Sequence, residues 1–276
     1  MIDSFRNIFA IPDLRKRVIF TFALLAVYRL GAHIPIPGVD PVALNEFFEA
    51  ARGTVLGFLN LFSGGALGRM TIFALGIMPY ISASIILQLL TVVWPYLEKL
   101  SKEGELGRRK ITQYTRYGTV VLSVIQSMGI SFFLEKQAAP GGAPLVPEDI
   151  QGWGFRLLTV LTLTTGTAFV MWLGEQISER GIGNGISLII FAGIVVGLPS
   201  AIFSTVTNLQ TGSMSIITIA ILVIFMVVVV AAIVYMERAQ RRIPIQYAKR
   251  VVGRRVYGGQ STYLPVSYTH LTLPTS

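Results

Sequence analysis

Side chains that commonly carry out chemistry are scarce in this chain. It has no cysteine, and its two histidines, His33 and His270, lie far apart in the sequence. A histidine zinc site needs three or four clustered ligands, and thiolate chemistry needs cysteine. Four threonines form a polar cluster in an apolar stretch, but helical threonines usually donate to their own helix carbonyls. No histidine, lysine or aspartate lies near this cluster in sequence to activate a hydroxyl: Thr162, Thr164, Thr165 and Thr167. The sequence therefore predicts no enzyme, no cofactor and no metal site.

A glycine-rich run at residues 181–185 (GIGNG) is the one candidate for a nucleotide loop. It does not match G-x-G-x-x-G, and it lacks the Lys-Ser/Thr pair of a phosphate-binding loop. Glycine also permits positive φ in tight turns. We therefore interpret the run as a turn that starts the following helix.

Composition indicates a protein that is largely surrounded by lipid. Hydrophobic residues make up 53% of the 276 residues, and charged residues only 13%. Soluble domains carry about 25% charged residues. The mean hydropathy of +0.64 agrees with this. The chain has too few polar residues to cover soluble cores, so its apolar residues must face the bilayer.

Six stretches are long and apolar enough to cross a membrane, which takes about 20 residues at 1.5 Å each. In the second stretch, Gly76 and Pro79 predict a bent or angled helix. In the fifth, Gly193 and Gly197 would allow close helix packing. The six stretches are residues 18–36, 71–94, 115–134, 153–173, 184–203 and 215–236.

The distribution of basic residues predicts the orientation of these spans. If the N-terminus is cytoplasmic and the spans alternate, eighteen of the 23 lysines and arginines fall on the cytoplasmic side. That asymmetry is what the positive-inside rule expects. The other five are Arg29, Arg52, Arg69, Lys136 and Arg156.

Residues 56–69 (LGFLNLFSGGALGR) are apolar but too short to cross a bilayer. They could form an amphipathic helix at the outer interface, or fold back into a cavity between the spans. Irregular backbone at membrane depth is tolerated only where protein or water satisfies it. Spacing alone slightly favours the interfacial helix.

Two basic stretches, residues 99–116 and 237–255, lie on the expected cytoplasmic side. One explanation is that they only orient the neighbouring spans. The other is that clustered arginines, beside Tyr247 and Tyr257, bind an acidic protein face or the phosphates of ribosomal RNA. Charge alone leaves both explanations open.

Several longer motifs, spread along most of the chain, carry a more specific signal. Together they resemble the SecY family of protein-translocation channels. The motifs are IPIPG (34–38), NLFSGGAL (60–67), ALGIMPYISAS (74–84), EGELGRRK (103–110), QYTRYG (113–118), MWLGEQ (171–176), ERGIGNGIS (179–187), YAKR (247–250) and GRRVY (253–257).

This resemblance implies an all-α membrane protein from a family with ten spans in two inverted halves. The chain would hold six transmembrane helices and a short re-entrant plug helix at residues 56–69. Residues 1–203 would be the first half, and residues 204–266 would be span six with a basic cytoplasmic loop. The implied function is a central channel subunit that translocates unfolded preproteins across the bacterial inner membrane and inserts membrane proteins into it.

The resemblance also implies which residues form the pore. A ring of isoleucines would form its narrowest point, where branched apolar side chains wet poorly and so block ions. Each pair in the ring is spaced i, i+4, which points both side chains the same way on a helix. The ring residues are Ile77, Ile81, Ile186 and Ile190.

Three further sets of residues follow from the same resemblance. The plug residues would be Asn60, Phe62, Ser63, Gly64, Gly65 and Arg69, and the lateral-gate residues Ser82 and Gln88. Partner-binding residues would be Arg108, Arg109, Arg242, Arg254 and Arg255. The implied partners are SecE and SecG in the membrane, the SecA motor ATPase, the ribosome, preprotein signal sequences and lipid.

The resemblance is expected to end near residue 266, before spans seven to ten of the family. Residues 267–276 (SYTHLTLPTS) are interpreted as a foreign tail on an incomplete copy, and they are left out of functional reasoning. An alternative function is a polytopic, inverted-repeat solute transporter. A transporter predicts substrate-binding polar groups near the midplane, where the sequence has few.

Overall fold

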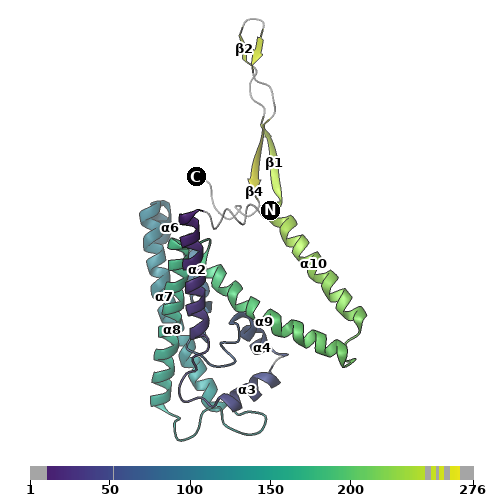
Figure 1. Ribbon diagram of the computed structural model, residues 1–276. Coiled ribbons are helices and arrows are strands. Elements are labelled where there is room, and N and C mark those ends of the chain that lie inside the picture. Colours follow the sequence, from purple (N-terminus) through teal and green to yellow (C-terminus); the bar gives the residue numbers. More distant parts are fainter. Residues whose placement is uncertain (1–10, 52, 246–249, 253–254, 258–261, 268–276) are drawn as a thin grey trace. The chain divides into compact units, whose positions relative to one another are not determined.

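The computed structural model describes residues 11–51, 53–245, 250–252, 255–257 and 262–267. It divides into two compact units, Met1–Ala201 and Ile202–Ser276, and each is described by itself. Figure 1 shows the succession of elements along the chain. The helices are α2 (Pro12–Gly31), α3 (Pro41–Ala50), α4 (Val55–Phe62), α5 (Met78–Val93), α6 (Pro95–Lys102), α7 (Glu105–Lys136), α8 (Trp153–Arg180), α9 (Gly185–Gln210) and α10 (Ile216–Arg238).

Within the described residues, four helices are long and apolar enough to cross a membrane, namely α7, α8, α9 and α10. A fifth is reached if α5 and α6 form one span, although they are bent by 98° where they meet. Helix α2 falls outside this group because charged residues interrupt it, at Asp13, Arg15–Arg17 and Arg29. The structure thus supports a helical membrane protein, and the count of six spans stays a prediction.

The most extensive helix packing in the first unit is between the antiparallel helices α7 and α8, which run side by side in Figure 1. Five small hydroxyl residues recur at every fourth position of α7, and all are buried. Each donates to a carbonyl three or four residues earlier in its own helix, so the hydroxyls are satisfied without a partner helix. Small side chains let helices approach closely within a membrane. These residues are Thr115, Thr119, Ser123, Ser127 and Ser131.

Two ion pairs join α7 and α8 at their opposite ends. Arg116 Nε lies 2.7 Å from Glu175 Oε1 at one end, and Arg156 Nη2 lies 2.7 Å from Glu135 Oε2 at the other. The Glu135 carboxylate also accepts the backbone N–H of Gly152 at 3.0 Å. The guanidinium of Arg156 stacks on the Phe132 ring, 4.3 Å from its centroid. These contacts fix the antiparallel register of the two helices.

Helix α5 begins at Met78, so the expected span 71–94 is helical only in its second part. Pro79 lies in the first turn of α5, where a missing N–H costs nothing, and it does not bend a helix. The prediction of a bend at Gly76 and Pro79 was therefore wrong. The bend lies at the junction of α5 and α6, where Trp94 is extended because it precedes Pro95.

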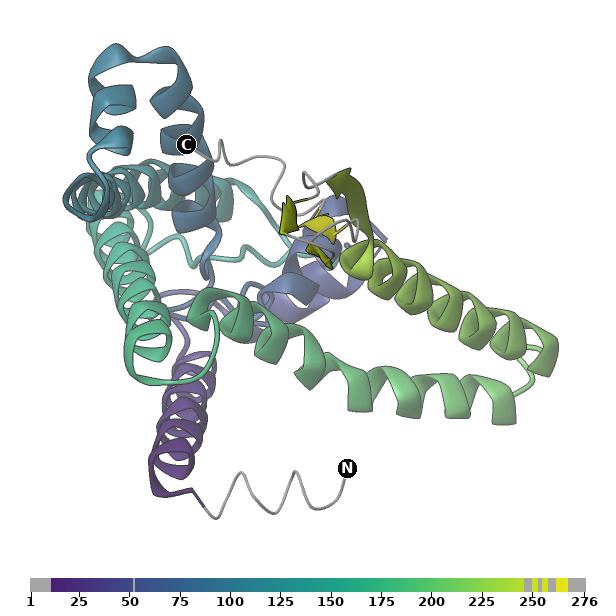
Figure 2. The same cartoon turned by 90° about the horizontal axis from the view of Figure 1, so that it is seen from above.

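Helix α2 packs against α8, as Figures 1 and 2 show. Thr21 of α2 accepts the backbone N–H of Ile182 at 3.1 Å. A Cβ on Gly181 would lie 2.5 Å from the Thr21 hydroxyl oxygen, so glycine is needed for this contact. Gly183 has a φ of +69°, as expected for a turn. The GIGNG run is thus a turn that docks on α2 and starts α9.

Four short strands follow α10, which an all-α prediction did not include. Strand β1 (Gln240–Ile245) pairs antiparallel with β4 (Thr262–Ser267), and β2 (Arg250–Val252) pairs antiparallel with β3 (Arg255–Tyr257). They lie in the segment expected to be a basic cytoplasmic loop. The prediction of a loop relied on the clustered arginines and gave no weight to the valine, isoleucine and threonine residues there, which favour strands.

We predict that Arg156→Ala destabilises the α7–α8 pair, because it leaves the Glu135 carboxylate, only 6% exposed, without its cation. Breaking a buried pair costs 3–5 kcal/mol, and since Arg156 itself is partly exposed we expect a loss of about 2 kcal/mol. Unfolding in mixed micelles, followed by tryptophan fluorescence, measures it.

The control is Glu98→Gln, which removes an exposed pair with Lys102 within α6. Exposed pairs add little to stability, so this variant should unfold like the wild type. Equal unfolding of Arg156→Ala and wild type would show that the ion pair does not stabilise the helix pair.

Candidate functional site

The segment predicted to be a plug folds into a compact helix and turn, held by hydrogen bonds of its own. It consists of α4 followed by turns from Ser63 to Met70. The Asn60 side chain accepts the Gly68 N–H at 2.6 Å, and the Asn60 carbonyl accepts the Gly65 N–H at 2.9 Å. Ser63 Oγ donates to the Asn60 carbonyl at 2.9 Å and accepts the Leu67 N–H at 3.1 Å. Polar plug residues therefore satisfy the backbone of the turn from within.

This turn lies directly against α9. Gly64 has a φ of +64°, and a Cβ added there would lie 2.8 Å from the carbonyl oxygen of Gly193. Gly193 was expected to pack helix against helix together with Gly197. Instead its backbone faces the plug turn, and a Cβ on Gly197 would meet nothing within 4 Å. The close approach is between a turn and a helix.

Two arginines donate to adjacent carbonyls of the same turn. Arg29 of α2 donates from Nη1 to the Gly64 carbonyl at 3.0 Å, and Arg69 donates from Nε to the Gly65 carbonyl at 3.2 Å. The turn is thus folded back onto the bundle. One face of α4 stays exposed, through Val55, Phe58 and Leu61. The side chain of Phe62 lies outside the described residues.

After this segment, residues 71–77 pass through the interior of the unit without forming a helix. Ile36 donates to the Met70 carbonyl at 2.8 Å, and Ile72 donates to the Ile34 carbonyl at 3.0 Å. A Cβ on Gly166 of α8 would clash with the Ile72 carbonyl. Most of residues 71–77 are buried. This irregular backbone can lie at depth because protein surrounds it.

A cavity of about 720 Å³ lies between the plug turn and the expected pore ring. Three predicted ring residues line it, namely Ile77, Ile81 and Ile190. Ile77 caps α5, and the Ile81 N–H donates to its carbonyl at 3.1 Å, so the two lie one turn apart. Residues of the predicted plug on the same wall are Leu56, Phe58, Leu59, Ser63 and Leu67.

The fourth predicted ring residue, Ile186, does not line this cavity. Its Cγ1 lies 3.1 Å from the Cβ position of Gly174 on α8. It still packs on the same apolar cluster as the other three ring residues. Sequence reasoning missed Ile189, which is 1% exposed and lines the cavity. It also missed Gln126 of α7, whose amide in an apolar stretch was an available signal.

The two predicted gate residues on α5 have different surroundings. Ser82 is half-buried and lines the cavity. Gln88 lies further along the exposed side of α5, and its backbone carbonyl accepts the Thr91 hydroxyl at 2.6 Å. The structure therefore joins only Ser82 to the ring.

The predicted partner-binding arginines lie in two places. Arg108 and Arg109 are exposed near the start of α7. Arg242 is in β1 and Arg255 in β3, while Arg254 lies outside the described residues. Among the described residues, no three carboxylate or imidazole side chains are grouped so that they could hold a metal ion.

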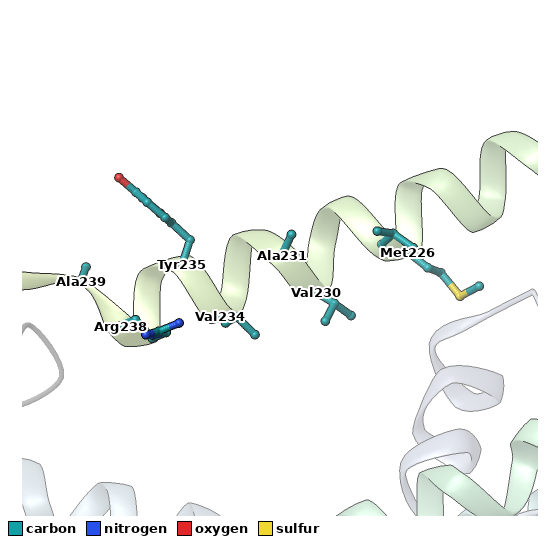
Figure 3. Close-up of a pocket in the computed structure, with 8 residues that line it drawn as sticks. Met226, Val230, Ala231, Val234, Tyr235, Arg238 and Ala239 are labelled. Carbon is teal, nitrogen blue, oxygen red and sulfur yellow. The ribbon is translucent and has the colours of Figure 1, made fainter. Parts of the chain in front are cut away.

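A second hollow lies along α10, between Met226 and Ala239, and is shown in Figure 3. Its volume is about 1060 Å³, but its lining comes from α10 and the residue after it. No described part of α10 is buried. The hollow is thus the open flank of one apolar helix, and it brings no set of polar groups together.

Comparison with known proteins gives a consistent result. The family model described as SecY matches residues 71–271, five residues beyond the expected end of the resemblance. The protein translocase subunit SecY of Escherichia coli strain K12 is 53% identical over 254 residues, which cover 92% of this chain and 56% of that protein. That of Aquifex aeolicus strain VF5 is 48% identical over 267 residues, covering 96% and 62%. The chain thus spans little more than half the length of these relatives.

Solved structures show the same fold at low sequence identity. A structure titled "The structure of a protein conducting channel" has a TM-score of 0.58 and 20% identity, covering 92% of this chain and 52% of that one. Sec61 in the canine ribosome-channel complex from the endoplasmic reticulum has a TM-score of 0.56 and 20% identity, covering 84% and 49%.

We predict that Gly64→Ala displaces the turn from α9. The added Cβ would meet the Gly193 backbone at a distance that real side chains do not adopt, and the positive φ adds strain. A single cysteine introduced at Ser63 should then react faster with a water-soluble maleimide.

The matched control is Gly183→Ala, in the turn before α9. Its φ of +69° is similar, but a Cβ there would meet nothing within 4 Å. If both variants changed maleimide labelling at Ser63 equally, contact with Gly193 would not be the cause.

Proposed function

The chain belongs to the SecY family, and on that premise we propose that it forms part of a protein-conducting channel. It would contribute the first pseudo-symmetric half, residues 1–203, and the sixth span with its basic loop, residues 204–266. The channel would translocate unfolded preproteins across the bacterial inner membrane and insert membrane proteins into it. The channel activity proposed is that of the whole family protein, and this chain spans little more than half the length of the relatives it matches.

The apolar cavity beneath the plug turn is the main support for this proposal. Ile77 and Ile81 of the α5 end and Ile190 of α9 reach the cavity from different elements. No charged side chain is among the described residues that line it. Branched apolar side chains at a constriction block ions by dewetting, yet form no lasting bonds to a passing chain. Ile186 of α9, which lies beside Gly174 of α8, would complete the ring.

The folded segment at residues 56–69 would be the plug that closes the outer funnel. Its internal hydrogen bonds, centred on Asn60 and Ser63, would let it leave and return as one folded piece. Gly64 and Gly65 have φ values of +64° and +81°, which allow the tight turn that fits against α9. Those internal hydrogen bonds would move with the segment, and displacement would break the Arg29 bond to Gly64 and expose Ala66, which is buried on the bundle.

Helix α5 would form one wall of a lateral gate, with Ser82 facing the pore and Gln88 further along the wall. We propose six spans, formed by α2, α5 with α6, α7, α8, α9 and α10. The N-terminus would be cytoplasmic, since this orientation places eighteen of the 23 basic residues inside.

The basic regions would bind partners on the cytoplasmic side. Arg108 and Arg109 are exposed at the start of α7, as a docking surface requires. Arg242, Arg254 and Arg255 would form a second surface for the SecA motor or the ribosome. A ribosome complex is named for the similar Sec61 channel. SecE, SecG, lipid and preprotein signal sequences would contact the membrane part.

We predict that Ile81→Gly makes the channel leak ions, because it removes a branched side chain from the constriction. The variant is made in the full-length protein and assayed by conductance in planar bilayers without preprotein. Resting conductance should rise severalfold.

The control is Ile86→Gly on the same helix, which carries the same backbone cost but is exposed and does not line the cavity. Unchanged conductance and secretion in Ile81→Gly would disprove the ring assignment.

We also predict that Arg254→Glu weakens binding of SecA or ribosomes about tenfold, since a charge-assisted hydrogen bond is worth about 1.5–3 kcal/mol. Co-sedimentation with proteoliposomes measures it, and membrane insertion should not change. Arg254→Lys separates charge from fork geometry, and should bind nearly as well if charge suffices. Equal affinity of Arg254→Glu and wild type would refute the docking surface.

A further inference from the structure

Arg29 is a charged side chain in an otherwise apolar part of α2. Between Val18 and Gly31 it is the only charged residue of the helix. Charged groups in membrane helices are costly and usually have a specific partner. The partner here is an uncharged backbone group, the Gly64 carbonyl, at 3.0 Å. The second half of α2 therefore places a guanidinium against one carbonyl of the plug turn.

The hydrogen bonds of the turn are otherwise internal. Within the described chain, those made by residues 63–69 run among residues 59–71, apart from the bond from Arg29. The internal bonds would move with the turn. The turn also packs on the bundle without hydrogen bonds, through the approach of Gly64 to the Gly193 backbone and through Ala66, which is 0% exposed in an apolar cluster with Tyr28. Among the described residues, the Arg29 bond is the one hydrogen bond that the bundle makes to residues 63–69.

The conformation of Gly64 leaves its carbonyl accessible to such a bond. The residue has no side chain, and its φ of +64° belongs to the left-handed region that favours glycine. The adjacent Gly65 carbonyl accepts a hydrogen bond from Arg69, which belongs to the same segment. Arg69 thus closes the turn on itself, and Arg29 ties the closed turn to α2.

We propose that Arg29 is a latch, a positioning residue that holds the plug in its resting place by one charge-assisted bond to Gly64. The proposal rests on the plug function assigned above. A carbonyl partner suits a latch, because the bond breaks without separating two opposite charges. A carboxylate partner would form an ion pair and bind the guanidinium more tightly.

Labelling of a single cysteine tests the latch. The chain has no native cysteine, so Leu67→Cys, beside the cavity, provides one reactive site in every variant. The protein is reconstituted in liposomes and treated with a membrane-impermeant maleimide. The labelling rate follows the fraction of molecules in which the plug is displaced. With Arg29→Ala we expect the rate to rise about tenfold, which corresponds to 1.4 kcal/mol.

Two further variants separate the hydrogen bond from charge. Arg29→Gln keeps a donor without charge, and its labelling rate should fall between wild type and Arg29→Ala. Arg15→Ala removes one positive charge from the exposed start of the same helix and should label like the wild type. In a parallel set, Ser127→Cys, buried between α7 and α8, should stay unreactive and so report an intact bundle.

The latch is overturned if Arg29→Ala labels at the wild-type rate, or if Arg15→Ala raises the rate as much. If Arg29→Ala does not fold, Arg29→Gln decides in the same way. The assay contains neither preprotein nor motor. A negative result would therefore remove the latch and leave the channel proposal standing, while an Ile81→Gly variant without ion leakage would challenge the channel and leave the latch intact.

Discussion

The structure depends on one constraint, namely that irregular backbone inside a helical membrane bundle must find its hydrogen bonds within the protein. Residues 63–77 are such a stretch. Their N–H and carbonyl groups are met by the Asn60 and Ser63 side chains, by the chain at residues 34–36 and by Arg29. Close approach is possible because glycine stands at positions 31, 64 and 166, where a Cβ would collide with a neighbour.

That constraint distinguishes two parts of the first unit, the α7–α8 pair and the proposed plug segment. The α7–α8 pair has an ion pair at each end and a seam of buried hydroxyls that satisfy themselves. The hydrogen bonds of the plug turn run within the turn and its neighbouring residues, and among the described residues Arg29 alone donates to it from a helix of the bundle. The proposed channel would use this difference, with the helix pair as a fixed frame and the segment at residues 56–69 as a movable plug.

Hydropathy predicted where the long helices lie, because lipid exposure demands about 20 apolar residues whatever else the chain does. It could not show that residues 71–77 are irregular, since buried irregular backbone is as apolar as a span. The role of Pro79 was predicted wrongly because hydropathy does not show that the helix begins at Met78, which makes Pro79 a first-turn residue. The i, i+4 spacing of Ile186 and Ile190 did not reveal that Ile186 contacts Gly174 of α8. The strands after α10 were not predicted, because the arginines of that segment were interpreted as those of a basic loop.

The composition of the cavity bears on which kind of transport the fold suits. A solute carrier binds its substrate through polar groups that converge near the midplane. Here the polar side chains on the wall are Tyr28, Ser63, Ser82 and Gln126, set among many aliphatic and aromatic neighbours. Ser63 already bonds within the plug turn. Such a wall offers a translocating chain little to bind, whatever its sequence. A passage for many different polypeptides needs that indifference, because any strongly bound segment would stop the rest from following.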